Sequence, residues 1–202
     1  VASGAADNCS IVDCLFINPY QAVDFGSKAA GRHYIRNLYG QPLYRGIYVD
    51  DCFDVGRIEN VHFWPFWCGD EPVHTFMTEQ AEAFIFGRTD WEFVSGCFCI
   101  WYHVGFRFIA GRQGPGNVLI TQSGSDIGPY AAIVDGAQAH AGHSFENCQL
   151  FGGLMVSETN SEASIASVTV SANGRKSSPT WPPTSASGMK TATVARVDEV
   201  TA

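Results

Sequence analysis

A short strand pattern, apolar-x-apolar, recurs along the chain at a nearly constant interval. The copies are Val23-Asp24-Phe25, Ile47-Tyr48-Val49, Phe84-Ile85-Phe86, Phe106-Arg107-Phe108, Ala132-Ile133-Val134 and Leu154-Met155-Val156. The steps between their first residues are 24, 37, 22, 26 and 22 residues, so four of the five steps fall within a narrow range. Such a period is typical of solenoids, in which a coil buries its apolar face by stacking on its neighbours.

A second pattern keeps the same period and ends in a small polar residue. Its copies are Ile11-Val12-Asp13, Ile35-Arg36-Asn37, Ile58-Glu59-Asn60, Phe93-Val94-Ser95, Leu119-Ile120-Thr121 and Phe145-Glu146-Asn147. Polar residues that recur at one corner of a stack can form a ladder, in which each side chain satisfies backbone groups and its neighbour in the next coil. We therefore expect Asn37, Asn60 and Asn147 at one corner of a stack of parallel strands.

Together the two patterns predict an all-β fold, a right-handed single-stranded parallel β-helix of about six coils over residues 1–160. The intervals lack the helical spacing that a doubly wound α/β fold requires. An antiparallel sandwich is the alternative, but hairpin dipeptides are missing between most of the strands. The long step predicts an inserted loop or short helix over residues 64–82, which we expect to overhang the strand face that bears Tyr48 and Ile85.

The repeat stops near residue 160, and the remaining chain is rich in Ser, Thr, Ala and Pro. This composition predicts an irregular tail or a truncated coil over residues 161–202, because it offers little apolar surface to bury. One strand is expected at residues 167–170. Residues 172–202 are expected to be cut quickly by protease.

The Ile-x-Asn strand, the polar corner and the strand Gly46-Ile47-Tyr48-Val49 resemble the pectin-lyase-like, polygalacturonase-related β-helix proteins. The resemblance covers about 150 of the 202 residues. It implies a parallel β-helix with a carbohydrate groove on the outward face of the recurring strand. The catalytic phrases of polygalacturonases, such as Asn-Thr-Asp and Gly-His-Gly, have no match in this chain, so their mechanism is not carried over.

Alternation within the recurring strand places Asp24, Tyr48 and Arg107 on the outward face, with Asp50 one step further on. Asp24 and Asp50 lie on adjacent predicted coils, where two carboxyl groups can serve glycoside hydrolysis. Arg107 with His103, or with Arg45 from the turn one coil further away, could supply the cation that holds the carboxylate of a uronate and the base of a lyase. The structural alternatives are acids that complete turns and an arginine that pairs with an acid.

Aromatic residues are concentrated in the turns that enter the recurring strand. Aromatic rings on an exposed face suit stacking against the C–H faces of sugars. The alternative is that the rings plug the coils. The candidate substrate-binding residues are Tyr44, Tyr48, Trp64, Tyr102, His103 and Tyr130.

Charge and composition narrow the range of partners. The formal net charge is -8 and no basic stripe is present, which argues against nucleic acid as a partner. No apolar run is long enough to span a membrane. The seven cysteines are odd in number and show no zinc-site spacing, so we assign no metal site, and no motif indicates a cofactor. The chain begins without Met, and we expect a fragment or a processed product.

These observations favour a protein that engages polysaccharide, located outside the cell or at the cell surface. The first hypothesis is a carbohydrate-active enzyme, either a glycoside hydrolase or a polysaccharide lyase. The second is a non-catalytic carbohydrate-binding or structural β-helix, similar to a tailspike or an adhesin. The first needs convergent acids and bases, whereas the second needs only an aromatic platform on a rigid solenoid.

Overall fold

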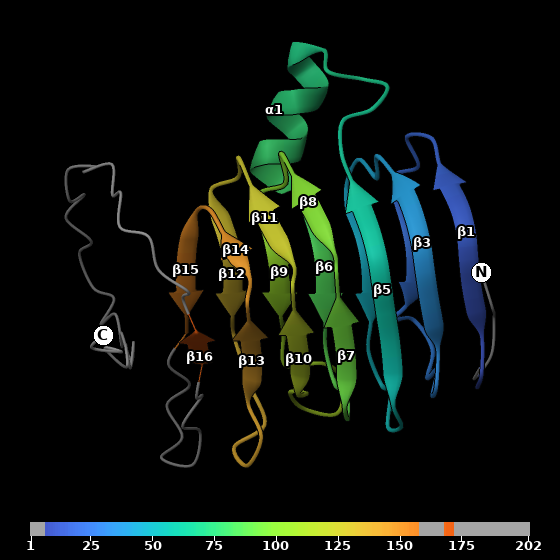
Figure 1. Cartoon of the computed structure of the whole chain (residues 1–202), viewed down its shortest axis with the longest axis vertical. Helices are drawn as coiled ribbons and strands as arrows, with labels where there is room; N and C mark the ends of the chain where they lie inside the picture. The colour runs from blue at the N-terminus through green and yellow to red at the C-terminus, as the bar shows by residue number, and fades with distance from the viewer. Residues whose placement is uncertain (1–6, 158–167, 172–202) are drawn as a thin grey trace, which may run out of the picture.

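The chain folds as a parallel β-solenoid of about six turns, seen in a computed structural model that describes residues 7–157 and 168–171. Its strands alternate between two sheets, and every strand pairing is parallel. In Figure 1 the front strands run upward, the rear strands run downward and successive coils advance from right to left. The winding is therefore right-handed, as the sequence predicts.

The six-stranded sheet, called sheet B, contains the recurring apolar-x-apolar pattern. Its strands are β2 (Gln21–Phe25), β4 (Arg45–Val49), β6 (Glu82–Phe86), β9 (Val104–Phe108), β12 (Tyr130–Val134) and β15 (Gly153–Val156). The register aligns the first residue of every copy, from Val23 through Ile47, Phe84 and onward to Leu154. The predicted repeat is thus confirmed residue by residue in this sheet.

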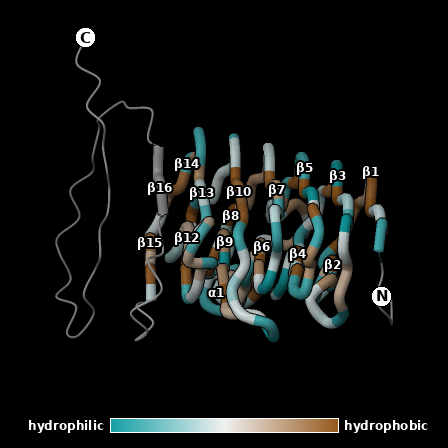
Figure 2. The backbone as a smooth tube through the Cα atoms, turned by 90° about the horizontal axis from the view of Figure 1, so that it is seen from below, coloured by the Kyte–Doolittle hydropathy of each residue, from teal (hydrophilic) through white to brown (hydrophobic). Residues whose placement is uncertain are grey.

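The ten-stranded sheet A faces sheet B, and Figure 2 shows the two as separate rows. Its first three coils contribute one long strand each, the next three contribute two shorter strands each, and β16 follows as a single short strand. The long strands are β1 (Ser10–Phe16), β3 (Tyr34–Gly40) and β5 (Gly56–Phe63). The shorter strands are β7 (Glu92–Ser95), β8 (Phe98–Ile100), β10 (Val118–Thr121), β11 (Gly124–Asp126), β13 (His143–Glu146), β14 (Gln149–Leu150) and β16 (Val168–Ser171).

Every coil bends sheet A at one residue in the left-handed backbone region. The residues are Asp13, Asn37, Asn60, Gly96, Gln122 and Asn147, with φ between 50° and 61°. L side chains rarely adopt this conformation, but glycine tolerates it and Asn or Asp reaches it more readily than most residues. The six positions stack along the solenoid and form the corner ladder, which contains the expected Asn37, Asn60 and Asn147.

The corner prediction is wrong by one residue in two coils. The sequence places Ser95 and Thr121 at the corner, whereas Gly96 and Gln122 occupy it. Val94 and Ile120 occupy the buried position that Ile58 has in its own coil, whereas the sequence pattern placed Phe93 and Leu119 there. Phe93 lies on the outer face and is 39% exposed. Because apolar residues occupy both faces here, alternation did not fix the register.

Side-chain hydrogen bonds join the first three members of the corner ladder. Asn37 Nδ2 donates to Asp13 Oδ1 at 2.7 Å, and Asn60 Nδ2 donates to Asn37 Oδ1 at 2.8 Å. Backbone bonds continue the series, since the N–H of Gly96 donates to the carbonyl of Thr121 at 3.1 Å. The corner therefore links neighbouring coils as well as bending them.

The interior between the sheets is apolar and rich in stacked aromatic rings. Phe84 stacks on Phe106 with ring centroids 5.1 Å apart, and Phe86 stacks on Phe108 at 5.6 Å. These four side chains are fully buried. One coil alone cannot bury such rings, so their stacking makes each coil depend on its neighbours.

The long step is an insertion on one side of the solenoid, above the middle coils where the sheet A strands end, and it carries the helix α1 (Glu71–Gln80) (Figure 1). Buried Gln41 anchors it, because its side-chain oxygen accepts from the backbone N–H groups of Trp67 and Cys68 at 3.0 Å. Phe76 of the helix contacts the rings of Tyr20 and Tyr44, where sheet B strands begin. Other rings of the segment lie on the sheet A side, where Trp64 and Phe66 contact His62 and where His74 of the helix contacts Trp101. The helix thus falls within the predicted insertion, and its ring contacts lie at the edges of the two sheets rather than at Tyr48 and Ile85.

Strand β16 pairs with β13 in parallel and in register, close to the strand expected at residues 167–170. The rest of the predicted tail, including residues 172–202, lies outside the described residues. No helix in the described part of the chain has the length and apolar character needed to cross a membrane.

The corner ladder predicts two separable effects at Asn37. Replacement by Ala should lower the free energy of unfolding by about 2 kcal/mol, since it removes hydrogen bonds worth about 1 kcal/mol and forces a left-handed alanine. Replacement by Gly should cost about 1 kcal/mol, because only the hydrogen bonds are lost. Urea unfolding of both variants measures the difference. Equal losses would contradict the conformational part of the explanation.

Candidate functional site

The outward stripe of sheet B is assembled as alternation predicts, but much of it is closed to solvent. Asp24, Tyr48, Ile85, Arg107, Ile133 and Met155 follow one another in register. Ile85 and Ile133 are nevertheless only 3% and 5% exposed. A continuous open groove along this stripe is therefore not present in the described residues.

The two predicted catalytic acids accept hydrogen bonds from the backbone and so stabilise the fold. Asp24 accepts from the backbone N–H groups of Gly26 and Ser27 at 2.9 and 2.8 Å, which closes a turn. Asp50 is 1% exposed, so the expectation that it faces solvent is wrong. Its carboxylate accepts from the backbone N–H groups of Arg88 and Arg112 at 2.7 and 3.2 Å. The chain segment that carries Arg112 thus covers this acid.

Arg107 points outward but is held between two acids. Its guanidinium pairs with Asp135, and its Nε lies 3.8 Å from Glu82 Oε1. Burial raises the pKa of Glu82, and the positive charge of Arg107 opposes that shift. Because Arg107 already neutralises protein carboxylates, it is poorly placed to hold the carboxylate of a substrate. Glu82 was not a sequence candidate, since its environment depends on residues two coils apart.

Four of the predicted sugar-binding residues do gather on sheet B. Tyr44 stacks on Tyr20 with ring centroids 4.9 Å apart, and Arg45 lies over the rings of both Tyr44 and Tyr48. His103 makes an edge contact with Tyr130 at 5.4 Å. The Nδ1 atom of His103 also lies 3.0 Å from the carbonyl of Thr78 in α1. These rings largely contact one another and the inserted helix.

Two other predicted sugar-binding residues lie elsewhere. Tyr102 is 1% exposed and donates a hydrogen bond to the carbonyl of Pro42 at 2.7 Å inside the coil, so its expected place at a groove edge is wrong. Trp64 follows β5 and contacts His62 and Phe98, both on sheet A. It therefore lies beside a different face from the predicted one.

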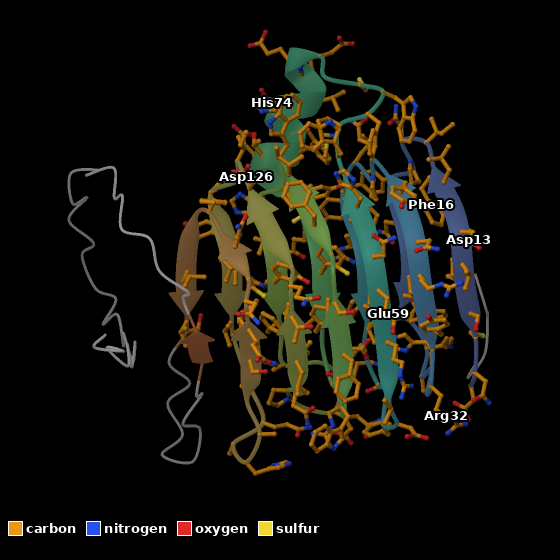
Figure 3. All side chains as sticks on the ribbon, in the orientation of Figure 1. Asp13, Phe16, Arg32, Glu59, His74 and Asp126 are labelled. Atoms are coloured by element: carbon orange, nitrogen blue, oxygen red, sulfur yellow. The ribbon has the colours of Figure 1, made fainter. Side chains whose placement is uncertain are left out.

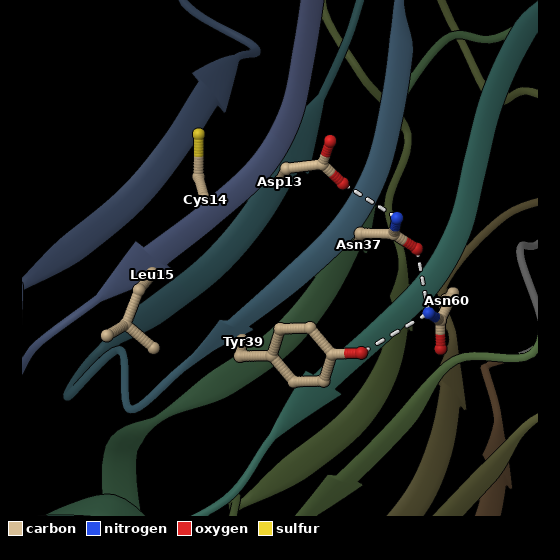
Figure 4. A pocket seen from close by; sticks show the side chains of 6 residues that line it. All are labelled: Asp13, Cys14, Leu15, Asn37, Tyr39 and Asn60. Carbon is tan, nitrogen blue, oxygen red and sulfur yellow. Dashed lines mark hydrogen bonds between the residues drawn. The ribbon is translucent and has the colours of Figure 1, made fainter.

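The clearest hollow lies on the outside of sheet A, at the corner ladder. Figure 4 shows it between the first three coils, where it has a volume of about 350 Å³. Its lining residues are Asp13, Cys14, Leu15, Asn37, Tyr39 and Asn60. A second hollow follows at the same corner in the later coils, lined by residues that include Gln122, Asn147 and Phe151. We call the two hollows together the corner groove; Figure 3 shows Asp13 on this sheet.

A row of apolar and aromatic side chains, some exposed and some half-buried, runs beside the corner groove. Leu15, Tyr39, His62 and Phe98 occupy one outward position on successive coils. His62 lies within 5.3 to 6.4 Å of the rings of Tyr39, Phe98, Trp64 and Phe66. Burial lowers the pKa of His62, so its ring is uncharged at neutral pH. We call this set the aromatic row.

The sequence also contains a signal for the aromatic row, on a different strand from the one that was predicted to bind sugar. Leu15, Tyr39 and His62 each lie two residues beyond a corner residue, as the alternation of a strand that continues past the corner requires. The resemblance to pectin-lyase-like proteins instead predicted that sugar binds to the outward face of the strands that form sheet B. The signal is a large apolar or aromatic residue two positions after each corner residue.

The interior holds a group of polar side chains that could bind a metal. The ligand atoms of His33, Cys52 and Glu92 all lie within 4.8 Å of one another. His33 Nε2 lies 2.8 Å from Glu92 Oε1, and both side chains are fully buried. Burial is the largest influence on His33 and lowers its pKa, but the charges and hydrogen bonds of Glu92 and Cys52 together outweigh it and raise the pKa to about 10. All seven cysteines are free thiols.

Comparison with known proteins adds no family to this picture. No protein-family model matches the chain, and neither a curated protein nor a solved structure matches it. The resemblance to pectin-lyase-like proteins is supported only as far as the parallel β-solenoid, which the structure shows.

A second buried histidine predicts how stability depends on pH. Burial lowers the pKa of His143 to about 4, while a contact between Nε2 and the Gly136 carbonyl at 3.0 Å acts in the opposite direction. The unfolded chain takes up a proton near pH 6.5, which the folded chain resists until about pH 4. Acidification through this window should therefore lower the free energy of unfolding by about 2 to 3 kcal/mol at this residue.

The measurement is urea unfolding of wild type and His143→Gln at pH 7 and pH 4.5. Wild type should lose about 2 kcal/mol more than the variant between the two pH values. An identical loss in both proteins would show that His143 does not carry the pH dependence.

Proposed function

We propose that the protein binds a polysaccharide along the corner groove of sheet A. The observation that carries this proposal is the alignment of a hydrogen-bonding ladder with an exposed row of rings. Tyr39 is 40% exposed and Trp64 is 39% exposed, beside a hollow lined by Asp13, Asn37 and Asn60. Sugar sites combine apolar platforms with a few placed polar groups, and this surface has both.

The spacing of the coils supports an extended ligand. Neighbouring parallel strands lie about 4.8 Å apart, which is close to the length of one sugar residue. The corner has a polar side chain in five of its six coils, the exception being Gly96, so a glycan chain that follows the axis meets polar groups in most of the coils. The carboxylate and amide oxygens of Asp13, Asn37 and Asn60 can accept from sugar hydroxyl groups, and the rings can stack on sugar faces.

The face of sheet B is less suited to this ligand. Its outward acids complete turns or pair with arginines, and Asp50 and Ile85 are closed to solvent. Its exposed rings contact α1 and one another. The corner groove therefore replaces the outward face of sheet B in our proposal.

Three aromatic substitutions distinguish the two faces. Tyr39→Ala should weaken oligosaccharide binding by about 2- to 12-fold, the equivalent of 0.5–1.5 kcal/mol for one stacked ring. Trp91→Ala is the matched control, because Trp91 is an exposed ring immediately before β7 of sheet A and does not line either hollow. Tyr48→Ala reports on sheet B. The measurement is calorimetric titration with neutral and uronate-containing oligosaccharides, after circular dichroism has confirmed the fold.

Weaker binding in Tyr39→Ala alone supports the corner groove. Weaker binding in Tyr48→Ala alone would move the ligand to sheet B. No binding of any glycan by wild type in the panel would remove the polysaccharide proposal.

A glycoside hydrolase is the second candidate, and one observation favours it. Glu82 has a raised pKa, as a general acid requires, and lies on the same side of sheet B as Asp135, two coils away. Carboxyl groups that serve an inverting hydrolase lie about 6.5–9.5 Å apart. Glu82 and Asp135 contact the same Arg107 guanidinium, which brings the two carboxyl groups near each other. Arg107 lies between the two carboxyl groups, and burial raises the pKa of Glu82.

Substitution of Glu82 tests this candidate. If the protein hydrolyses a glycan, Glu82→Gln should lower kcat at least 100-fold, since general acid catalysis contributes about 10²–10⁴-fold. Arg36→Ala, at an exposed site on sheet A, is the control. The assay is release of reducing ends over a polysaccharide panel. Full activity in Glu82→Gln would exclude Glu82 as the acid.

A further inference from the structure

Three side chains from three successive turns meet inside the solenoid, at the corner where the chain passes from sheet B to sheet A. His33 immediately precedes β3, Cys52 lies between β4 and β5, and Glu92 is the first residue of β7. We propose that these residues bind a divalent transition-metal ion of the zinc class, which clamps the three turns together. This site is separate from the corner groove and does not depend on the proposed function.

The donor atoms suit such an ion. Imidazole nitrogen, thiolate sulfur and carboxylate oxygen are the protein ligands of zinc. Around a tetrahedral zinc ion these atoms lie about 3.3–3.6 Å from one another, given bond lengths of 2.0–2.3 Å. Here they all lie within 4.8 Å, with His33 Nε2 and Glu92 Oε1 2.8 Å apart. Side-chain shifts of about one ångström therefore suffice to surround an ion.

Two further observations point to a ligand. Glu92 Oε2 is fully buried and has no hydrogen-bond partner, although an unpaired buried carboxylate oxygen is costly. The Nδ1 atom of His33 lies 3.3 Å from the Ala30 carbonyl, which fixes the ring with Nε2 toward Glu92. Metal-binding histidines are commonly oriented in this way by a carbonyl on the other ring nitrogen.

Gly56 leaves the space in which the side chains of His33 and Glu92 approach each other. Gly56 pairs with Glu92 in the sheet, and its coil lies between those of His33 and Glu92. A Cβ atom at this position would overlap Glu92 Oε2 and His33 Cε1. The missing side chain therefore opens the space in which ligands from the flanking coils converge.

Burial indicates a structural role for the ion. The side chains of His33 and Glu92 have no solvent-accessible surface, and Cys52 is also fully buried. Substrate therefore has no direct approach. A water molecule or a backbone oxygen can complete the coordination, and the Asp54 carbonyl already lies 2.8 Å from Cys52 Sγ. An ion shared by three turns stabilises the folded chain by mass action.

The test uses the full chain, purified with a chelator and a non-thiol reductant and then titrated with Co²⁺ as a spectroscopic probe. Wild type should bind one Co²⁺ per chain, with thiolate-to-metal charge-transfer absorption and intense four-coordinate visible bands. Zn²⁺ should displace the Co²⁺ and raise the melting temperature. Cys52→Ser should abolish the charge-transfer band, and Glu92→Gln should weaken binding at least 10-fold.

Cys97→Ser is the matched control, since Cys97 is a buried cysteine of the same core outside this group. It should bind Co²⁺ as wild type does. Absence of Co²⁺ binding by wild type would overturn the proposal, as would a charge-transfer band that survives in Cys52→Ser. Should Cys52→Ser fail to fold, unchanged Co²⁺ affinity and spectrum in folded Glu92→Gln would overturn it equally.

Discussion

The left-handed residue at the bend of sheet A is the constraint on which the rest of the solenoid depends. Each coil must turn at the same place for its strands to pair with the coils on both sides. Few residue types accept a positive φ, so the corner selects Asp, Asn and Gly in five of its six places. The backbone requirement therefore lines up polar side chains, and the corner groove is a by-product of the geometry that shapes the coil.

Much of the fold followed from the sequence because the repeat is a local pattern read many times. The sheet B register was predicted residue by residue, from Val23 to Leu154, since its inward positions are uniformly apolar. The sheet A register slipped at Phe93 and Leu119, where apolar residues lie on the outer face as well. A periodic signal fixes a register only where the two faces differ in polarity.

The candidate site followed from the sequence much less well. Alternation correctly oriented Tyr48 and Arg107, but it cannot report what covers a strand. Asp50 is enclosed because backbone N–H groups of Arg88 and Arg112, far along the chain, converge on its carboxylate. His33, Cys52 and Glu92 meet for a similar reason, since spacing along the chain carries no trace of stacking between coils. A site formed by residues from several coils can be recognised only from the folded structure.

The insertion has a consequence for how the chain finds its fold. Coils that repeat the same contacts can in principle pair one step out of place, with little loss of hydrogen bonding or apolar burial. Gln41 breaks that equivalence, because its side chain accepts from the backbone of Trp67 and Cys68 and sits beneath α1. The coil that contains Gln41 is therefore completed by the segment that contains Trp67 and Cys68. The contacts of Gln41 with the insertion thus favour the native pairing of coils over a pairing shifted by one coil.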